Sequence, residues 1–91
     1  MANTEYVGDI LAERGKRYGS FESGADVAMG LQFTVNDHLR GKALRNDVRY
    51  ALQMICNKMA RIINGDPEYV DNWDDIAGYA QLVADRIRNE S

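Results

Sequence analysis

The fold of this chain is decided by the stretch NDVRYALQMICNKMARIINGDPEYVDNWDDIAGYAQLVADRI, which runs from Asn46 to Ile87. Apolar residues recur in it at spacings of three and four, the pattern of one face of an amphipathic helix. The first apolar stripe consists of Val48, Leu52, Ile55, Met59 and Ile62, with Ala51 and Ile63 alongside. The second stripe consists of Trp73, Ile76, Ala80, Val83 and Ile87. We predict two long helices, at about 46–64 and 72–88, that pack antiparallel as a helical hairpin.

Residues at the ends of the two segments support these boundaries. Asn46 is a suitable N-cap for the first helix, because its side chain can accept a hydrogen bond from a free backbone N–H. Gly65 stands where helices commonly end in a left-handed residue, and Pro67 cannot continue a helix. Asp71 or Asn72 would cap the second helix.

The first half of the chain predicts two more helices. One runs from a cap at Asn3 or Thr4 to about Gly15, and the other runs from Ser23 to about Leu39. Between them lies a polar, glycine-bearing segment, and the basic connector RGKALR joins the second helix to the hairpin. No alternating apolar pattern lasts long enough to predict a strand. We therefore expect one all-α domain over 1–91, a compact bundle of about four helices.

Composition narrows the possible functions. The 91 residues carry a net charge of −3, which argues against general nucleic-acid binding but allows a small anion in a local basic pocket. So small a domain has a modest core, so we expect a homo-oligomer. The lone Cys56 and the lone His38 provide neither a disulfide nor a zinc ligand set. With no leader-like stretch and no long apolar run, we expect a soluble cytoplasmic protein without membrane contact.

The segment ERGKRYGSF, between Glu13 and Phe21, concentrates cations, aromatics and glycines. Arg14, Lys16 and Tyr18 are its candidate ligand-binding residues, since glycines let backbone N–H groups approach a phosphate while the cations supply charge. The alternative is an ordinary helix C-terminus, where cations interact favourably with the negative end of the helix dipole.

A second set of polar residues lies on the hairpin, outside its apolar stripes. The first helix offers Lys58 and Arg61, and the second offers Asp71, Asp74, Asp75 and Tyr79. Facing each other, these groups could hold Mg²⁺, hold a phosphate, or pair with one another. Carboxylates in a first helical turn are also stabilising for structural reasons alone.

Three segments carry a family resemblance: ERGKRYGSF, NKMARIINGDPEY and NWDDIAGYAQLVADRI. From about Leu11 to Ile87 the chain resembles a family of small phage and prophage proteins of unknown function. That family is distantly similar to the MazG-like all-α nucleotide pyrophosphohydrolases, which are usually oligomeric and use Mg²⁺ held by acidic residues. The resemblance implies that Asp75 is the last acidic position of their metal-binding helix, followed by Tyr79. It also implies that Lys58 and Arg61 lie on the phosphate side.

The chain departs from the pyrophosphohydrolases in one respect. Their second acidic cluster, of the form EExxE, has no counterpart here, because no acidic residue lies between Asp47 and Asp66. Metal-assisted phosphoryl chemistry needs several carboxylates to fix Mg²⁺ and orient water. We therefore expect a phage-type, non-catalytic nucleotide-binding protein that sequesters a nucleotide signal in counter-defence. Its phosphate ligands would be Arg14, Lys16, Lys58 and Arg61, with Tyr18 or Tyr79 on the base or ribose.

Two alternatives remain open. The first is an enzyme, a divergent Mg²⁺-dependent nucleotide pyrophosphohydrolase, in which Asp75 with Asp74 or Asp71 binds metal and Glu13 or Glu22 completes the site. The second is a helical protein-interaction module that inhibits a host protein through its acidic surface.

Overall fold

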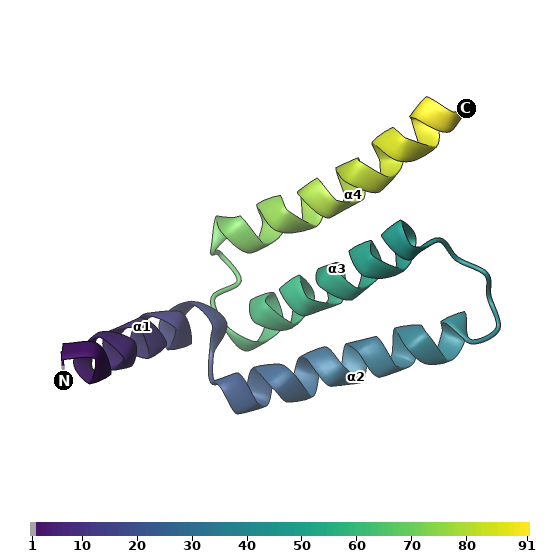
Figure 1. Cartoon of the computed structure of the whole chain (residues 1–91). Coiled ribbons are helices and arrows are strands. Elements are labelled where there is room, and N and C mark those ends of the chain that lie inside the picture. Colours follow the sequence, from purple (N-terminus) through teal and green to yellow (C-terminus); the bar gives the residue numbers. More distant parts are fainter. Residues whose placement is uncertain (1) are drawn as a thin grey trace.

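The computed structural model describes the backbone of residues 2–91 and the side chains of residues 7–91. It contains four helices, α1 (Ala2–Tyr18), α2 (Phe21–Leu39), α3 (Asn46–Asn64) and α4 (Val70–Glu90), and no strand within residues 2–91. The predicted all-α class, the four helices and the antiparallel hairpin are confirmed. In Figure 1, α2, α3 and α4 lie side by side with α3 in the middle, and α1 extends beyond the end of this layer.

The largest difference from the predicted boundaries concerns the glycine-bearing segment. α1 continues to Tyr18 rather than ending near Gly15, so most of ERGKRYGSF is helical and only Gly19 and Ser20 link α1 to α2. The cations Lys16 and Arg17 occupy the last turn of α1, as the helix-dipole alternative requires. Ser20 caps α2, because its side chain accepts a hydrogen bond from the backbone N–H of Ser23.

The ends of the hairpin helices lie close to their predicted positions. α3 begins at Asn46, so that the cap position falls on Arg45, which makes no side-chain capping bond. Gly65 follows α3 as expected, but its φ of −122° lies outside the left-handed region. α4 begins at Val70, slightly before the predicted caps.

α3 is held on its two sides by different kinds of contact. Toward α2, Gln32 Nε2 donates a hydrogen bond to Asn57 Oδ1 at 2.6 Å. Toward α4, Lys58 Nζ lies 2.9 Å from a carboxylate oxygen of Asp75. Two further helix–helix contacts join Arg86 to Asp47 at 2.8 Å and Ser23 to Asn64 at 2.6 Å. The layer is therefore held by polar contacts as well as by apolar packing.

The apolar stripe of α3 is less buried than the hairpin prediction implies. The buried apolar residues are small, namely Ala51, Cys56 and Ala60. From the stripe itself, Met59 and the adjoining Ile63 are exposed, and the remaining large residues are only half-buried. The same holds for α4, where Trp73 keeps 53% of its surface exposed. The hairpin was predicted correctly, but the large residues of its stripes are half-buried or exposed rather than buried.

The resulting molecule is long and thin. Its principal extents are 53 × 27 × 27 Å and its Cα radius of gyration is 16.0 Å. Within residues 2–91, none of the helices has the length and apolar character that crossing a membrane requires.

Cys56 is a free thiol buried between α2 and α3, and its burial raises the pKa of the thiol.

Candidate functional site

The two-residue link between α1 and α2 is fastened to the C-terminal end of α3. The side-chain amide of Asn64 donates hydrogen bonds to the backbone carbonyls of Tyr18, at 2.9 Å, and Ser20, at 3.0 Å. Its carbonyl oxygen accepts a hydrogen bond from the Ser23 hydroxyl at 2.6 Å. One side chain therefore joins the end of α1, the start of α2 and the end of α3.

Two glycines allow this junction to close. Gly19 has a φ of +77°, in the left-handed region, and a Cβ there would collide with the backbone carbonyl of Asn64. A Cβ on Gly65 would collide with the backbone of Arg17 and Tyr18, and the N–H of Asp66 donates to the Arg17 carbonyl at 2.8 Å. The ERGKRYGSF and NGDPEY segments therefore meet within one subunit, a question that the sequence leaves open.

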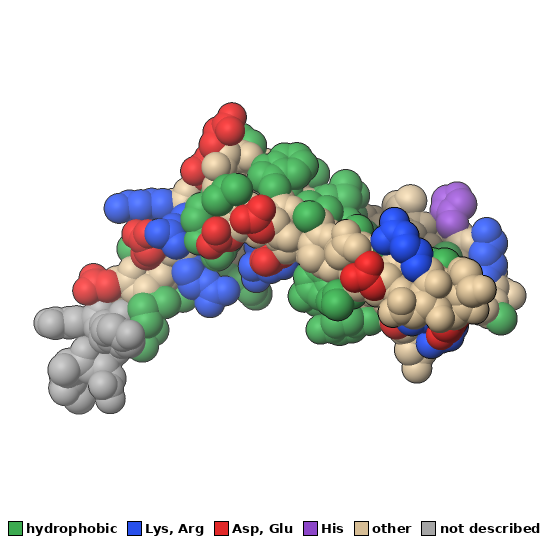
Figure 2. Space-filling view, turned by 90° about the horizontal axis from the view of Figure 1, so that it is seen from above, with side chains coloured by type: hydrophobic (Ala, Val, Ile, Leu, Met, Phe, Trp, Pro, Cys, Tyr) green, Lys and Arg blue, Asp and Glu red, His purple; other side chains and the backbone are tan. Residues whose placement is uncertain are grey.

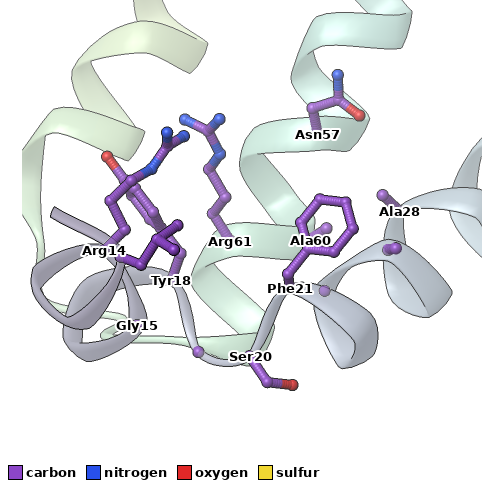
Figure 3. Close-up of a pocket in the computed structure, with 13 residues that line it drawn as sticks. Arg14, Gly15, Tyr18, Ser20, Phe21, Ala28, Asn57, Ala60 and Arg61 are labelled. Atoms are coloured by element: carbon purple, nitrogen blue, oxygen red, sulfur yellow. The ribbon is translucent and has the colours of Figure 1, made fainter. Parts of the chain in front are cut away.

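A pocket of about 510 Å³ opens beside this junction, between α1, α2 and α3. Its walls are largely small or apolar, and include Leu11, Ala25, Ala28 and Ala60. The first residues of α2, Ser20 and Phe21, form one edge. Figure 3 shows the Phe21 side chain at the start of α2. This ring is 91% exposed, so it is available to a ligand in the pocket.

Two arginines supply the charge of the pocket. The guanidinium carbon of Arg61 lies 4.6 Å from the centroid of the Tyr18 ring, and that of Arg14 lies 5.8 Å from it. Both side chains reach toward the same side of the pocket, with Tyr18 beside them (Figure 3). No carboxylate of residues 7–91 forms a salt bridge with either guanidinium. Two guanidinium groups without a carboxylate partner therefore converge on one apolar pocket.

The neighbouring Arg17 has a different role, because its charge is already engaged. It pairs with Glu13 at 2.8 Å and donates to the Tyr69 hydroxyl at 2.9 Å. Tyr69 in turn donates to Asp71 at 2.7 Å, and this hydrogen bond raises the pKa of Tyr69. The rings of Tyr69 and Tyr18 meet edge to face at 6.1 Å. This network packs against Tyr18 on the side that faces α4.

The remaining predicted ligand-binding residues lie elsewhere. Lys58 is buried between α3 and α4, 2.9 Å from Asp75. Tyr79 packs edge to face against Tyr50 at 6.3 Å between ring centroids. Lys16 is exposed on α1 and does not line the pocket. Of the six predicted ligand residues, the structure therefore brings together Arg14, Tyr18 and Arg61.

The predicted metal ligands do not form a cluster. Asp75 is paired with Lys58, Asp71 accepts a hydrogen bond from Tyr69, and Asp74 is exposed on the first turn of α4. Among the residues that the structure describes, no group of three or more His, Cys, Asp or Glu side chains is placed to hold a metal ion. A Mg²⁺ site at these positions stays a prediction without geometric support.

Three residues of this region were not assigned a site role from the sequence: Ser20, Phe21 and Asn64. The exposure of Phe21 depends on the short link, which the sequence prediction made longer than it is. The Asn-Gly pair at 64–65 suggests a turn, but it gives no indication that the asparagine bonds to residues more than 40 positions away.

Fold and pocket together define a small all-α protein with a cationic, aromatic-lined pocket beside a fixed helix junction. The chain belongs to the family described as a domain of unknown function, DUF6378, whose model matches residues 7–87. The match includes α2 and α3, most of α1 and α4, and every residue of the pocket. Neither the curated proteins nor the solved structures provide a match to this chain.

Proposed function

We propose that this protein binds a nucleotide in the pocket between α1, α2 and α3 without converting it. One observation carries the proposal: Arg14 and Arg61 flank Tyr18 at the pocket with no carboxylate partner from residues 7–91. Guanidinium groups match the geometry of phosphate oxygens and hold them through paired, charge-assisted hydrogen bonds. Arginines left without a carboxylate are available for such an anion.

The rest of the pocket suits the remainder of a nucleotide. The N-terminus of α2 lies at its edge through Ser20 and Phe21, and the positive end of a helix dipole favours phosphate. Aromatic faces at Tyr18 and Phe21 can stack on a base. A volume of about 510 Å³ lies within the range of about 300–1,000 Å³ usual for small-molecule sites.

Binding without turnover is favoured by the residues that line the pocket. No Asp or Glu of the described chain is among them, whereas Mg²⁺-assisted phosphoryl transfer needs several carboxylates near the phosphates. An origin in a phage, a distant relation to the MazG-like pyrophosphohydrolases and sequestration of a nucleotide signal in counter-defence belong to the same proposal. They rest on the sequence resemblance.

The test is equilibrium dialysis of the protein against a panel of linear and cyclic nucleotides, with and without Mg²⁺. Arg61→Ala should weaken binding by about 10- to 150-fold, which corresponds to the roughly 1.5–3 kcal/mol of a hydrogen bond to a charged group. Arg88→Ala is the matched control, since Arg88 is an exposed arginine on α4, away from the pocket. It should bind as the wild type does.

Chromatography of the bound and free fractions separates binding from turnover. Recovery of the unchanged nucleotide from the denatured protein supports the proposal. Conversion to a monophosphate and pyrophosphate would contradict the non-catalytic part of it. Equal binding by Arg61→Ala and the wild type would contradict the assignment of the pocket.

A further inference from the structure

The layer formed by α2, α3 and α4 has two faces, and only one of them carries the pocket. Arg61 lines that pocket, and an α-helix turns by about 100° per residue. Met59 and Ile63 are each two positions from Arg61, so they lie about 200° around α3, on the opposite face. We call this opposite surface the open face. On α3 it comprises Leu52, Ile55, Met59 and Ile63, and we assign to it four residues from the apolar stripe of the neighbouring α4, namely Trp73, Ile76, Ala80 and Ile87.

The open face is apolar throughout and insufficiently covered. None of its eight residues is charged, and four of them, Met59, Ile63, Trp73 and Ile87, are exposed. Ile63 keeps 61% of its surface exposed and Ile87 keeps 50%. Figure 2 shows hydrophobic side chains at the surface on both sides of the charged α4 edge. Contiguous exposed apolar patches mark interaction sites, and interface centres are depleted of charged residues.

The total surface of the chain is larger than expected for a folded monomer of its mass. It amounts to 6829 Å², whereas a folded monomer of this mass is expected to expose about 5,400 Å². The radius of gyration of 16.0 Å likewise exceeds the roughly 12 Å expected for a domain of this length. The excess is roughly 1,400 Å² per chain, and α1, which extends beyond the layer, contributes to it (Figure 1). Covering the open face would remove part of this surface, and permanent interfaces bury about 2,000 Å² or more per pair.

We propose that the open face is a self-association interface, covered by the open face of a second copy of this chain. A two-fold pairing brings the same patch of both copies together. Because that patch is apolar and uncharged, self-pairing introduces no repulsion between like charges. Two layers stacked in this way enclose one shared core, the usual solution for an amphipathic layer.

A second copy fits better than a different protein because the face is needed for folding itself. The isolated chain buries only Ala51, Cys56 and Ala60 as apolar core within residues 7–91, and a core this small is a weak basis for stability. The surface that covers the open face must therefore be present whenever the chain is folded. Another copy of the same chain meets this requirement at all times. The proposal is independent of nucleotide binding, since the pocket lies on the other face.

The test uses the full chain and its single tryptophan, Trp73, which lies on the open face. Light scattering coupled to size-exclusion chromatography should give twice the mass of one 10.3 kDa chain. In the assembled protein, Trp73 should be shielded from acrylamide quenching, and on dilution its emission should shift to longer wavelength together with the fall in mass. Ile63→Glu should abolish the dimer. Leu82→Glu, at an exposed leucine of α4 outside the open face, should preserve it.

Three outcomes would overturn the proposal. The wild type could have the mass of a single chain at all concentrations, in which case a different protein covers the face. It could associate while Trp73 stays as accessible to acrylamide as in the dilute, dissociated chain, which would place the interface elsewhere. Ile63→Glu could retain the wild-type mass. If Ile63→Glu does not fold, the quenching of wild-type Trp73 still decides the matter.

Discussion

Asn64 should contribute far more to stability than a polar residue at a helix end usually does. Its side chain makes three hydrogen bonds, to the carbonyls of Tyr18 and Ser20 and to the hydroxyl of Ser23. Each hydrogen bond contributes about 0.5–1.5 kcal/mol net, and two of these three are at exposed positions. We therefore expect Asn64→Ala to lower the free energy of unfolding by about 2 kcal/mol, a large share of the roughly 5–14 kcal/mol expected for this length.

Asn64→Asp separates the hydrogen-bond argument from a simple loss of packing. It keeps the size of the side chain and the acceptor for Ser23, but it replaces the donating amide with a carboxylate oxygen. That oxygen would face the carbonyls of Tyr18 and Ser20. Because this contact is repulsive and removes the donor from both backbone carbonyls, Asn64→Asp should be destabilised more than Asn64→Ala.

The assay is urea unfolding followed by far-UV circular dichroism at one fixed protein concentration, since self-association would otherwise shift the midpoint. Asn89→Ala is the control, because Asn89 is an exposed asparagine near the end of α4. It should change the free energy of unfolding by less than about 0.5 kcal/mol. If Asn64→Ala behaves like this control, or if Asn64→Asp is as stable as the wild type, the junction does not hold the fold as argued.

Two further predictions concern the backbone and the ion pairs. Gly65→Ala should lower the free energy of unfolding by about 1–3 kcal/mol, because the added Cβ would meet the Arg17 backbone. Gly78→Ala, where a Cβ has no neighbour within 4 Å, should raise the free energy of unfolding by up to about 1 kcal/mol. Equal effects of the two variants in thermal unfolding would refute this reasoning. The hydrogen bond from Arg86 lowers the pKa of Asp47. The Asp47–Arg86 pair therefore stabilises the fold at a pH above the ordinary aspartate pKa, and this stabilisation is lost as the pH falls through the lowered pKa of Asp47. At neutral pH the wild type should have a higher free energy of unfolding than Asp47→Asn, and the difference should disappear in acid. A difference that does not change with pH would contradict this prediction.

The sequence was sufficient to predict the helices, because their signals are local. Apolar spacing, the Gly65–Pro67 break and the polar connector all act over one or two turns. Three of the residues predicted to bind a ligand, Arg14, Tyr18 and Arg61, also converge at the pocket. The sequence grouped them as one candidate site, but it left open whether the two distant segments meet within one subunit.

What the sequence could not provide was the direction in which each helix faces. An apolar stripe predicts that a face will be covered, but it does not say whether the covering surface is a neighbouring helix or another molecule. Lys58 illustrates the difficulty: the sequence allowed it either to hold a phosphate or to pair with an aspartate of the second helix, and the structure has it buried against Asp75. Tyr79 was likewise predicted to contact a ligand, and its partner is Tyr50 on α3.

The closed junction around Gly19, Asn64 and Gly65 restricts where the length of the chain can vary. At that end of the layer, the α1–α2 link contacts the end of α3 so closely that even a methyl group at either glycine collides with backbone. An inserted residue there would separate Arg14 and Tyr18 from Arg61. At the opposite end, a Cβ on Gly41 would meet nothing within 4 Å. Insertions and deletions tolerated during evolution should therefore gather in the α2–α3 connector and be excluded from the two links at the pocket end.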